Sequence, residues 1–142
     1  MSTDRTFELQ RFVDAQAPVI DRVRAELRAG HKQSHWMWFV FPQLAGLGRS
    51  AMAARYAIAS LEEARAYLAH PILGPRLKEC TQLVLDIKGR SIAAIFGHPD
   101  DVKFQSSMTL FAQAAPGDKV FADALRIYFS ALPNAATLAR LG

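Results

Sequence analysis

Residues suited to binding a planar ligand gather in the stretch from His35 to Gln43. Both tryptophans of the chain, Trp36 and Trp38, stand here one residue apart, in an apolar run that ends at Phe41. In a helix two such residues point about 200° apart, so one can pack in the core while the other lines a cleft and stacks on a flat ring. His35 suits either a hydrogen bond at the edge of the core or a contact with a ligand.

A second polar group begins at Asp101 and continues into a predicted helix. Lys103 and Ser107 are four residues apart, a spacing that puts both side chains on one helix face. The start of this helix would offer free backbone N–H groups to an anion, unless Asp101 or its neighbour Asp100 caps them. Ser107 can bond back to the preceding turn, and a Lys103–Ser107 nucleophile pair has no accompanying oxyanion motif. We therefore predict binding residues and assign no catalytic residue.

Arg76 is a further candidate, because its planar guanidinium can hold a carboxylate or a phosphate. It can equally pair with Glu79 at the surface, an interaction of little energetic weight. His31 and His35 have the spacing of two metal ligands on a helix, but no third ligand stands nearby in the sequence, and a zinc site needs three or four. The sequence holds no Walker loop, dinucleotide fingerprint or zinc-protease motif. We predict no metal and no cofactor.

The composition is that of one ordinary globular domain, residues 1–142. A single cysteine, Cys80, excludes an intrachain disulfide and fits a reducing compartment. The start of the chain lacks the regions of a signal peptide, and no apolar stretch is long enough to span a membrane, so we expect a cytoplasmic protein without a membrane partner. The net charge of +4 is scattered along the chain, which disfavours a nucleic-acid partner.

Capping and breaking residues divide the chain into helices, and no alternating strand pattern competes with them. Pro18 should kink or divide the first helix, Ser34 can cap a buried helix that ends before Pro42, and Ser60 with Glu63 forms a capping box. The pattern predicts an all-α fold, a single compact domain of about seven to nine mostly short helices with irregular orthogonal packing and no sheet. The expected helices cover residues 7–29, 35–41, 50–59, 61–69, 71–87, 92–96, 100–113 and 119–132, with a last turn ending at 141.

Long segments of the chain, spread from Leu9 to Leu141, resemble the DUF1810 family, a mostly bacterial family of unknown function. They are SHWMWFVFPQ (34–43), GLGRS (46–50), YLAHPILGPRL (67–77), IFG (95–97) and DDVKFQSSMTLF (100–111). The resemblance implies a small helical fold and supplies no activity. Members sometimes carry the label calpastatin, which does not suit this apolar, well-capped chain, since calpastatin acts through disordered segments that fold on binding. A fainter similarity in fold and size is to the NADAR group, helical proteins tied to ADP-ribose and N-glycosidic chemistry.

Together these features predict one polar, aromatic-lined cleft. It would combine His35, Trp36 or Trp38, and Gln43 with Asp101, Lys103 and Ser107. Aromatic rings beside lysine and histidine donors suit a planar anionic small molecule, such as a nucleotide or an ADP-ribose derivative. Whether the chain also hydrolyses this ligand, and so is an enzyme, is left open. The alternative is a protein-protein interaction module without catalytic activity, which predicts an exposed apolar patch in place of the cleft.

Overall fold

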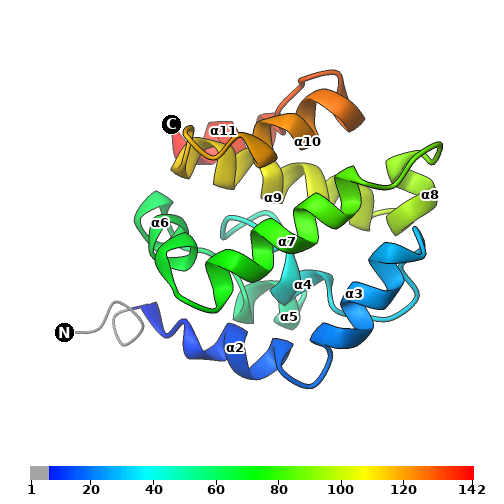
Figure 1. Cartoon of the computed structure of the whole chain (residues 1–142). Coiled ribbons are helices and arrows are strands. Elements are labelled where there is room, and N and C mark those ends of the chain that lie inside the picture. The colour runs from blue at the N-terminus through cyan, green and yellow to red at the C-terminus, as the bar shows by residue number, and fades with distance from the viewer. Residues whose placement is uncertain (1–6) are drawn as a thin grey trace.

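The structure is a computed structural model and describes residues 7–142 (Figure 1). Within this range the backbone forms ten helices and no strand, which confirms the all-α prediction with one helix more than the expected range. Leu44 and Ile58 form an isolated parallel bridge. The helices are α2 (Gln10–Gln16), α3 (Ile20–Arg28), α4 (Met37–Val40), α5 (Ala51–Arg55), α6 (Leu61–Ala69), α7 (Leu73–Leu85), α8 (Ile92–Phe96), α9 (Asp100–Ala114), α10 (Lys119–Phe129) and α11 (Ala135–Leu141).

Pro18 divides the predicted first helix into α2 and α3, as the sequence indicated. A proline inside a helix removes one backbone hydrogen bond and clashes with the preceding turn, so the chain breaks there. Gly30 follows the end of α3 with a φ of 73°. A glycine in this left-handed region is a frequent helix terminator, because it has no Cβ to clash.

The aromatic run forms a shorter helix than predicted. α4 covers only Met37–Val40 and has Trp36 at its N-cap position, with no side-chain cap. The predicted cap, Ser34, instead donates its hydroxyl proton to the Glu26 carboxylate across 2.5 Å. The prediction of a Ser34 cap is therefore wrong, because a charge-assisted bond to a carboxylate is stronger than a bond to a helix N–H group.

Other local caps are confirmed, with one exception. The Ser60 hydroxyl accepts a hydrogen bond from the Glu63 backbone N–H across 3.2 Å, which is the capping bond expected from the sequence. At α9, however, Pro99 occupies the N-cap position and no side chain caps the helix. The prediction that Asp100 or Asp101 is the N-cap of this helix is wrong, because both residues lie inside its first turn, where Asp101 Oδ1 still accepts a hydrogen bond from the Val102 N–H.

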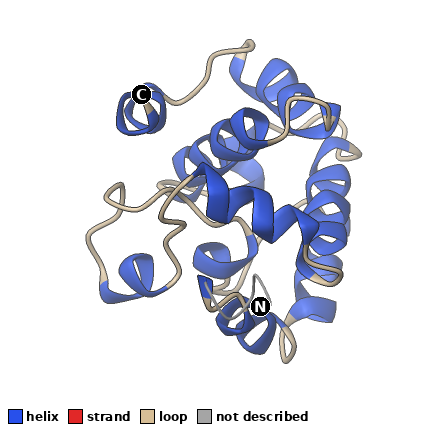
Figure 2. Ribbon diagram, turned by 90° about the vertical axis from the view of Figure 1, so that its left-hand side faces the viewer, coloured by secondary structure: helices blue, strands red, loops and turns tan. Residues whose placement is uncertain are grey.

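α9 lies at the centre of the helical packing and contacts α6, α8, α10 and α11. Figure 2 shows the molecule turned by 90°, and there every described segment is either a helix or a loop. Phe104 of α9 is fully buried, and its ring centre lies 5.1 Å from that of Phe41 and 5.0 Å from that of Phe96. These aromatic contacts hold the end of α4 and the end of α8 against the first half of α9, which places Trp38 near Lys103.

Candidate functional site

Lys103 and Trp38 come from different helices and meet in the folded chain. The Lys103 ammonium lies 5.4 Å from the centre of the Trp38 ring. Such a cation–π contact contributes about 0.5–1 kcal/mol at an exposed position and about 2 kcal/mol when it is shielded from water. Both residues are half-buried. The two polar groups singled out in the sequence are therefore neighbours in space.

Asp100 lies between two lysines. Its Oδ2 atom is 2.8 Å from the Lys32 ammonium, and its Oδ1 atom is 3.5 Å from the Lys103 ammonium. Lys32 in turn lies 5.1 Å from the centre of the Trp36 ring. Two ammonium groups and one carboxylate make up this lysine cluster. The Lys103 ammonium lies farther from the carboxylate and is more exposed than that of Lys32, so it is the one better placed to meet an anion.

Asp101, a predicted site residue, is engaged in a local turn. Its Oδ1 atom lies 2.9 Å from Nδ1 of His98 and also accepts a hydrogen bond from the Val102 backbone N–H across 2.9 Å. Asp101 is thus next to the lysine cluster in the chain but is directed to His98.

A hollow of about 290 Å³ lies beside Trp38. Small residues form most of its wall, and the full lining is Trp38, Gln43, Leu44, Ala45, Gly46, Gly48, Ala53, Ala54, Tyr56 and Ala57. The Trp38 indole N–H, the Gln43 amide and the Tyr56 hydroxyl form no hydrogen bond with any residue between 7 and 142. Three of the residues that line this concave, mainly apolar hollow therefore carry polar groups with unused hydrogen-bonding capacity, and small-molecule sites commonly combine an apolar surface with a few polar groups.

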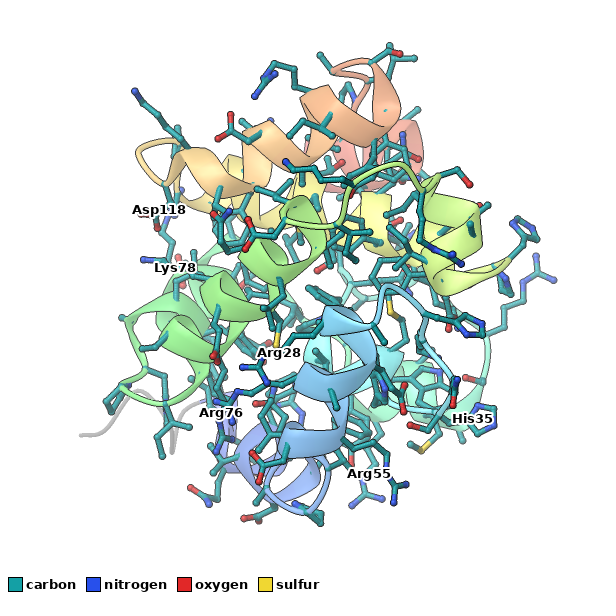
Figure 3. The ribbon with its side chains drawn as sticks, turned by 45° about the vertical axis from the view of Figure 1, so that its right-hand side comes forward. Arg28, His35, Arg55, Arg76, Lys78 and Asp118 are labelled. Carbon is teal, nitrogen blue, oxygen red and sulfur yellow. The ribbon has the colours of Figure 1, made fainter. Side chains whose placement is uncertain are left out.

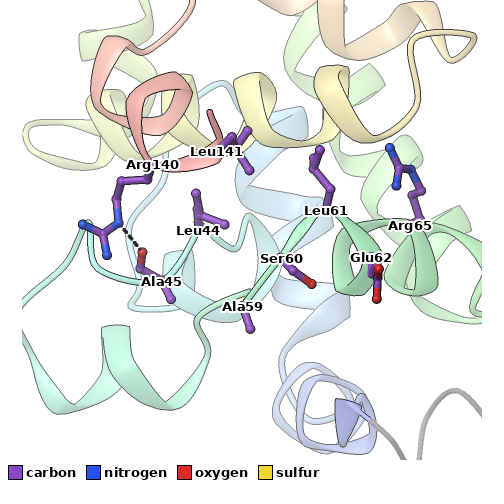
Figure 4. Close-up of a pocket in the computed structure, with 9 residues that line it drawn as sticks. All are labelled: Leu44, Ala45, Ala59, Ser60, Leu61, Glu62, Arg65, Arg140 and Leu141. Atoms are coloured by element: carbon purple, nitrogen blue, oxygen red, sulfur yellow. Dashed lines mark hydrogen bonds between the residues drawn. The ribbon is translucent and has the colours of Figure 1, made fainter.

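The wall of this hollow is held in place from the outside. Leu44 and Ala45 also line a second hollow, of about 450 Å³, between the start of α6 and the end of α11 (Figure 4). There Arg140 donates its Nε–H to the Ala45 carbonyl across 2.8 Å. The Ala45 N–H bonds the Ile58 carbonyl, and the Ile58 N–H bonds the Gln43 carbonyl, at 2.8 and 2.9 Å. These bonds fix the backbone from which Gln43 projects.

Ser107 lies one turn beyond Lys103 and is completely buried. Its hydroxyl is the one buried side-chain polar atom without a hydrogen-bond partner in the part of the chain that the structure describes. The neighbouring Ser106 and Thr109 hydroxyls, by contrast, donate to backbone carbonyls one turn earlier. An unpartnered buried hydroxyl costs about 1–3 kcal/mol. Because Ser107 has no exposed surface, it is not a nucleophile in this conformation.

The remaining candidates lie apart from the Trp38 hollow. Trp36 is 1% exposed and belongs to the core. His35 is exposed and bonds no described residue. Arg76, on α7, places Nη1 3.4 Å from Oε1 of Gln16. Arg76 and His35 lie on opposite sides of α3 in Figure 3, and Arg76 does not line the Trp38 hollow.

Glu26 is a residue that the sequence reasoning missed. Its carboxylate accepts four hydrogen bonds of 2.5–3.1 Å, from the backbone N–H groups of Gln33 and Ser34, the Ser34 hydroxyl and the Trp36 indole. Burial acts to raise its pKa, but these bonds together outweigh burial and lower the pKa to about 2. One signal was available, since a carboxylate in the last turn of a helix is unfavourable to the helix dipole and calls for another partner.

Neither a metal cluster nor a membrane helix is found in the described part of the chain. No three His, Cys, Asp or Glu side chains between residues 7 and 142 are grouped to hold a metal ion. No helix in that range is long and apolar enough to cross a membrane.

Comparison with known proteins gives a family and a structural relative. The family described as "Protein of unknown function (DUF1810)" matches residues 6–141. A crystal structure of the conserved hypothetical protein Rv1873 from Mycobacterium tuberculosis is 58% identical and has a TM-score of 0.95, over 96% of this chain and 97% of that chain. No curated protein matches the sequence. Since the family match spans nearly the whole sequence, this chain belongs to the DUF1810 family.

Proposed function

We propose that this protein binds a small planar anion in the hollow beside Trp38, with Lys103 meeting the negative charge. The observation that carries the proposal is the contact between the Lys103 ammonium and the Trp38 ring, because the same tryptophan lines the hollow. A flat ring would pack against Trp38 while an anionic group reaches the ammonium. The free polar groups of Gln43 and Tyr56 would hydrogen-bond to the edge of that ring.

The volume of the hollow limits the size of the ligand. Small-molecule sites usually occupy about 300–1,000 Å³, and this one has about 290 Å³. It therefore suits one aromatic ring system and part of a sugar rather than an extended dinucleotide. A mononucleotide, or the nucleoside end of an ADP-ribose derivative, would enter with its phosphate directed toward Lys103, which contacts Trp38 but does not itself line the hollow.

The charges around the hollow also favour an anion. Residues 27–61, which include every residue that lines it, contain no Asp or Glu. In the same stretch the Arg55 guanidinium lies 5.4 Å from the centre of the Tyr56 ring. Salt screens charges over about 8 Å at physiological ionic strength. Cations that touch the lining residues would therefore still act on a bound phosphate.

The proposal is limited to binding. Hydrolysis would need a base within reach of a water molecule beside the ligand. The carboxylates closest in sequence to Lys103 are Asp100 and Asp101, and they are engaged with Lys32 and His98. Ser107 is buried. We therefore assign no reaction to the site.

Isothermal titration calorimetry with four related compounds tests this proposal. We expect AMP and ADP-ribose to bind the wild-type chain. Adenosine and ribose 5-phosphate should bind more weakly, because adenosine lacks the charge and ribose 5-phosphate lacks the ring. Lys103→Ala should weaken AMP binding about five- to thirtyfold, the equivalent of about 1–2 kcal/mol.

Lys88→Ala is the matched control, since Lys88 is an exposed lysine that does not line the Trp38 hollow. Its affinity for AMP should equal that of the wild type. The proposal fails if none of the four compounds binds, or if Lys103→Ala binds AMP as tightly as the wild type does.

A further inference from the structure

The loop of residues 86–91 separates two further hollows. The larger, of about 570 Å³, lies between this loop, α8 and α10. The smaller, of about 430 Å³, lies between the loop and the end of α3. Ile87, Lys88 and Arg90 line both. The two hollows therefore lie on either side of one loop, and together they are called the 86–91 groove below.

The floor of the larger hollow is apolar and firmly held. Leu85, Ile92 and Tyr128 line it, together with Ile127, which is 50% exposed. The Tyr128 hydroxyl donates to the Val84 carbonyl across 2.7 Å, which ties α10 to the end of α7. The exposed Ile127 and the partly exposed Ile92 and Tyr128 offer apolar surface, bordered by polar residues, that the apolar side chains of a partner can cover.

The rim of the groove is basic. Lys88 forms no ion pair with any residue between 7 and 142, and Arg90 bonds only a backbone carbonyl, across 3.3 Å. No carboxylate lines the larger hollow. The smaller hollow has Asp86, whose Oδ1 atom accepts a hydrogen bond from Gln82, alongside the exposed Arg28. The excess of unpaired cations makes the rim complementary to acidic groups.

Arg90 is positioned before any partner binds. Its side-chain stem lies against Gly30, where an added Cβ would come within 3.2 Å of the Arg90 Cδ atom. The bond from its guanidinium to the Ala94 carbonyl restrains the other end of the side chain. A side chain that is already ordered loses less conformational freedom on binding, which favours association.

We propose that the 86–91 groove docks a peptide segment of another protein in which acidic and apolar side chains are interspersed. The apolar side chains would cover Ile127 and Tyr128, and the acidic ones would meet Lys88 and Arg90. A peptide suits this surface better than a nucleic acid does, because nucleic-acid sites cluster many more cations and bind chiefly through phosphates. The groove instead combines a few cations with an apolar floor.

Panning a display library of random linear peptides against the immobilised full-length chain supplies the probe. The selected peptides should be enriched in Asp and Glu placed among Leu, Ile and Phe. The affinity of a labelled selected peptide is then measured by fluorescence anisotropy. The paired change Lys88→Glu with Arg90→Glu should weaken it at least about tenfold, because attraction becomes repulsion. Ile127→Ser should weaken it about fivefold through loss of an apolar contact.

Arg22→Glu is the matched control, because Arg22 is an exposed arginine of α3 that lines neither hollow. It should leave the peptide affinity unchanged, and so should Lys103→Ala, which separates this surface from the Trp38 hollow. Lys88, Arg90 and Ile127 are all exposed, and Arg90 gives up only one long hydrogen bond to a backbone carbonyl, so the melting temperatures of the variants should stay close to that of the wild type.

Three results would overturn the proposal. The first is a selection that gives no peptides, or peptides without acidic enrichment. The second is unchanged peptide affinity in the paired charge variant. The third is the binding of a single-stranded RNA probe to the wild type, if the charge variant no longer binds the probe and Ile127→Ser binds it as well as the wild type does. That pattern belongs to a nucleic-acid surface.

Discussion

The Trp36 indole N–H donates a hydrogen bond to Oε1 of Glu26 across 2.9 Å, which ties the start of α4 to α3. The same carboxylate holds the loop before α4 through Gln33 and Ser34. This loop leads directly into α4, where Trp38 lines the candidate site. Glu26 therefore acts on the site indirectly, by fixing the segment that carries Trp38.

Glu26→Gln should destabilise the fold by about 2 kcal/mol, because a neutral amide accepts weaker bonds than a carboxylate and brings an N–H group toward donors. Chemical unfolding followed by circular dichroism measures the change. Glu62→Gln is the control, since Glu62 is exposed and forms no hydrogen bond within the described residues. Equal stability of the two variants would show that the Glu26 bonds do not stabilise the fold.

The contribution of Glu26 should depend on pH in a defined direction. Its pKa is about 2 in the folded chain, below the ordinary value of 4.5. A carboxyl group whose folded pKa is lowered stabilises the fold when it is ionised. The contribution is complete above about pH 4.5 and is lost as the pH falls from there toward about 2.

The stability difference between wild type and Glu26→Gln should therefore shrink as the pH is lowered through that window. Urea unfolding of both chains at a series of pH values measures it, and effects of the other carboxyl groups cancel in the difference. A difference that stays constant from neutral pH to about pH 2 would contradict the assignment.

Gly74→Ala should destabilise the chain even though alanine favours helices more than glycine does. Gly74 lies inside α7, where an added Cβ would collide with the Leu68 carbonyl oxygen of the preceding segment. Backbone cannot move aside as a flexible side chain can, so the expected cost is about 3 kcal/mol. Gly117→Ala is the matched control, because a Cβ there meets no atom within 4 Å. Thermal unfolding should show a clearly lower melting temperature for Gly74→Ala only. Equal melting temperatures of the two variants would contradict the collision at Gly74.

Cys80 should be unreactive in the folded chain. Burial, together with the nearby Glu79 carboxylate, raises the pKa of its thiol to about 12. Alkylation requires the thiolate, which is then almost absent near about pH 8. Mass spectrometry after iodoacetamide treatment should find no modified native protein and full modification in denaturant. Similar labelling rates in both states would contradict the burial of Cys80.

Asp100→Asn should strengthen AMP binding by about threefold, because the carboxylate competes with a phosphate for Lys103 at close range. Asp101→Asn should have little effect on the same affinity, since Asp101 is directed to His98. Calorimetry on both variants measures this. Weaker AMP binding in Asp100→Asn would mean that Asp100 supports the ligand site rather than opposing it.

Local signals in the sequence located most of the helices. The capping bond of Ser60 joins residues only three apart, and the break at Pro18 depends on its own ring, so both follow from short-range chemistry. Ser34 was misassigned because its actual partner is a carboxylate on the preceding helix. A competing partner brought in by folding cannot be read from the few residues around a cap.

The same distinction holds for the candidate site. The sequence predicted both Trp38 and Lys103 as binding residues from their side-chain types. Only the packing of α4 against α9 brings the two together. The choice between Trp36 and Trp38 depends on Glu26, which captures the Trp36 indole in the core. Arg76 has suitable chemistry, but α7 carries it to Gln16 instead. The sequence thus indicated which side chains could bind a ligand, but it did not indicate how far apart those side chains lie in the fold.

The two indole N–H groups allow the most direct test of the ligand site. Proton–nitrogen correlation spectra of the labelled chain should show one indole resonance for Trp36, bonded to Glu26, and one for Trp38, which has no protein partner among the described residues. On titration with AMP we expect the Trp38 resonance to move until it saturates while the Trp36 resonance stays in place. A Trp38 resonance that does not move, or equal movement of both, would contradict binding in the Trp38 hollow.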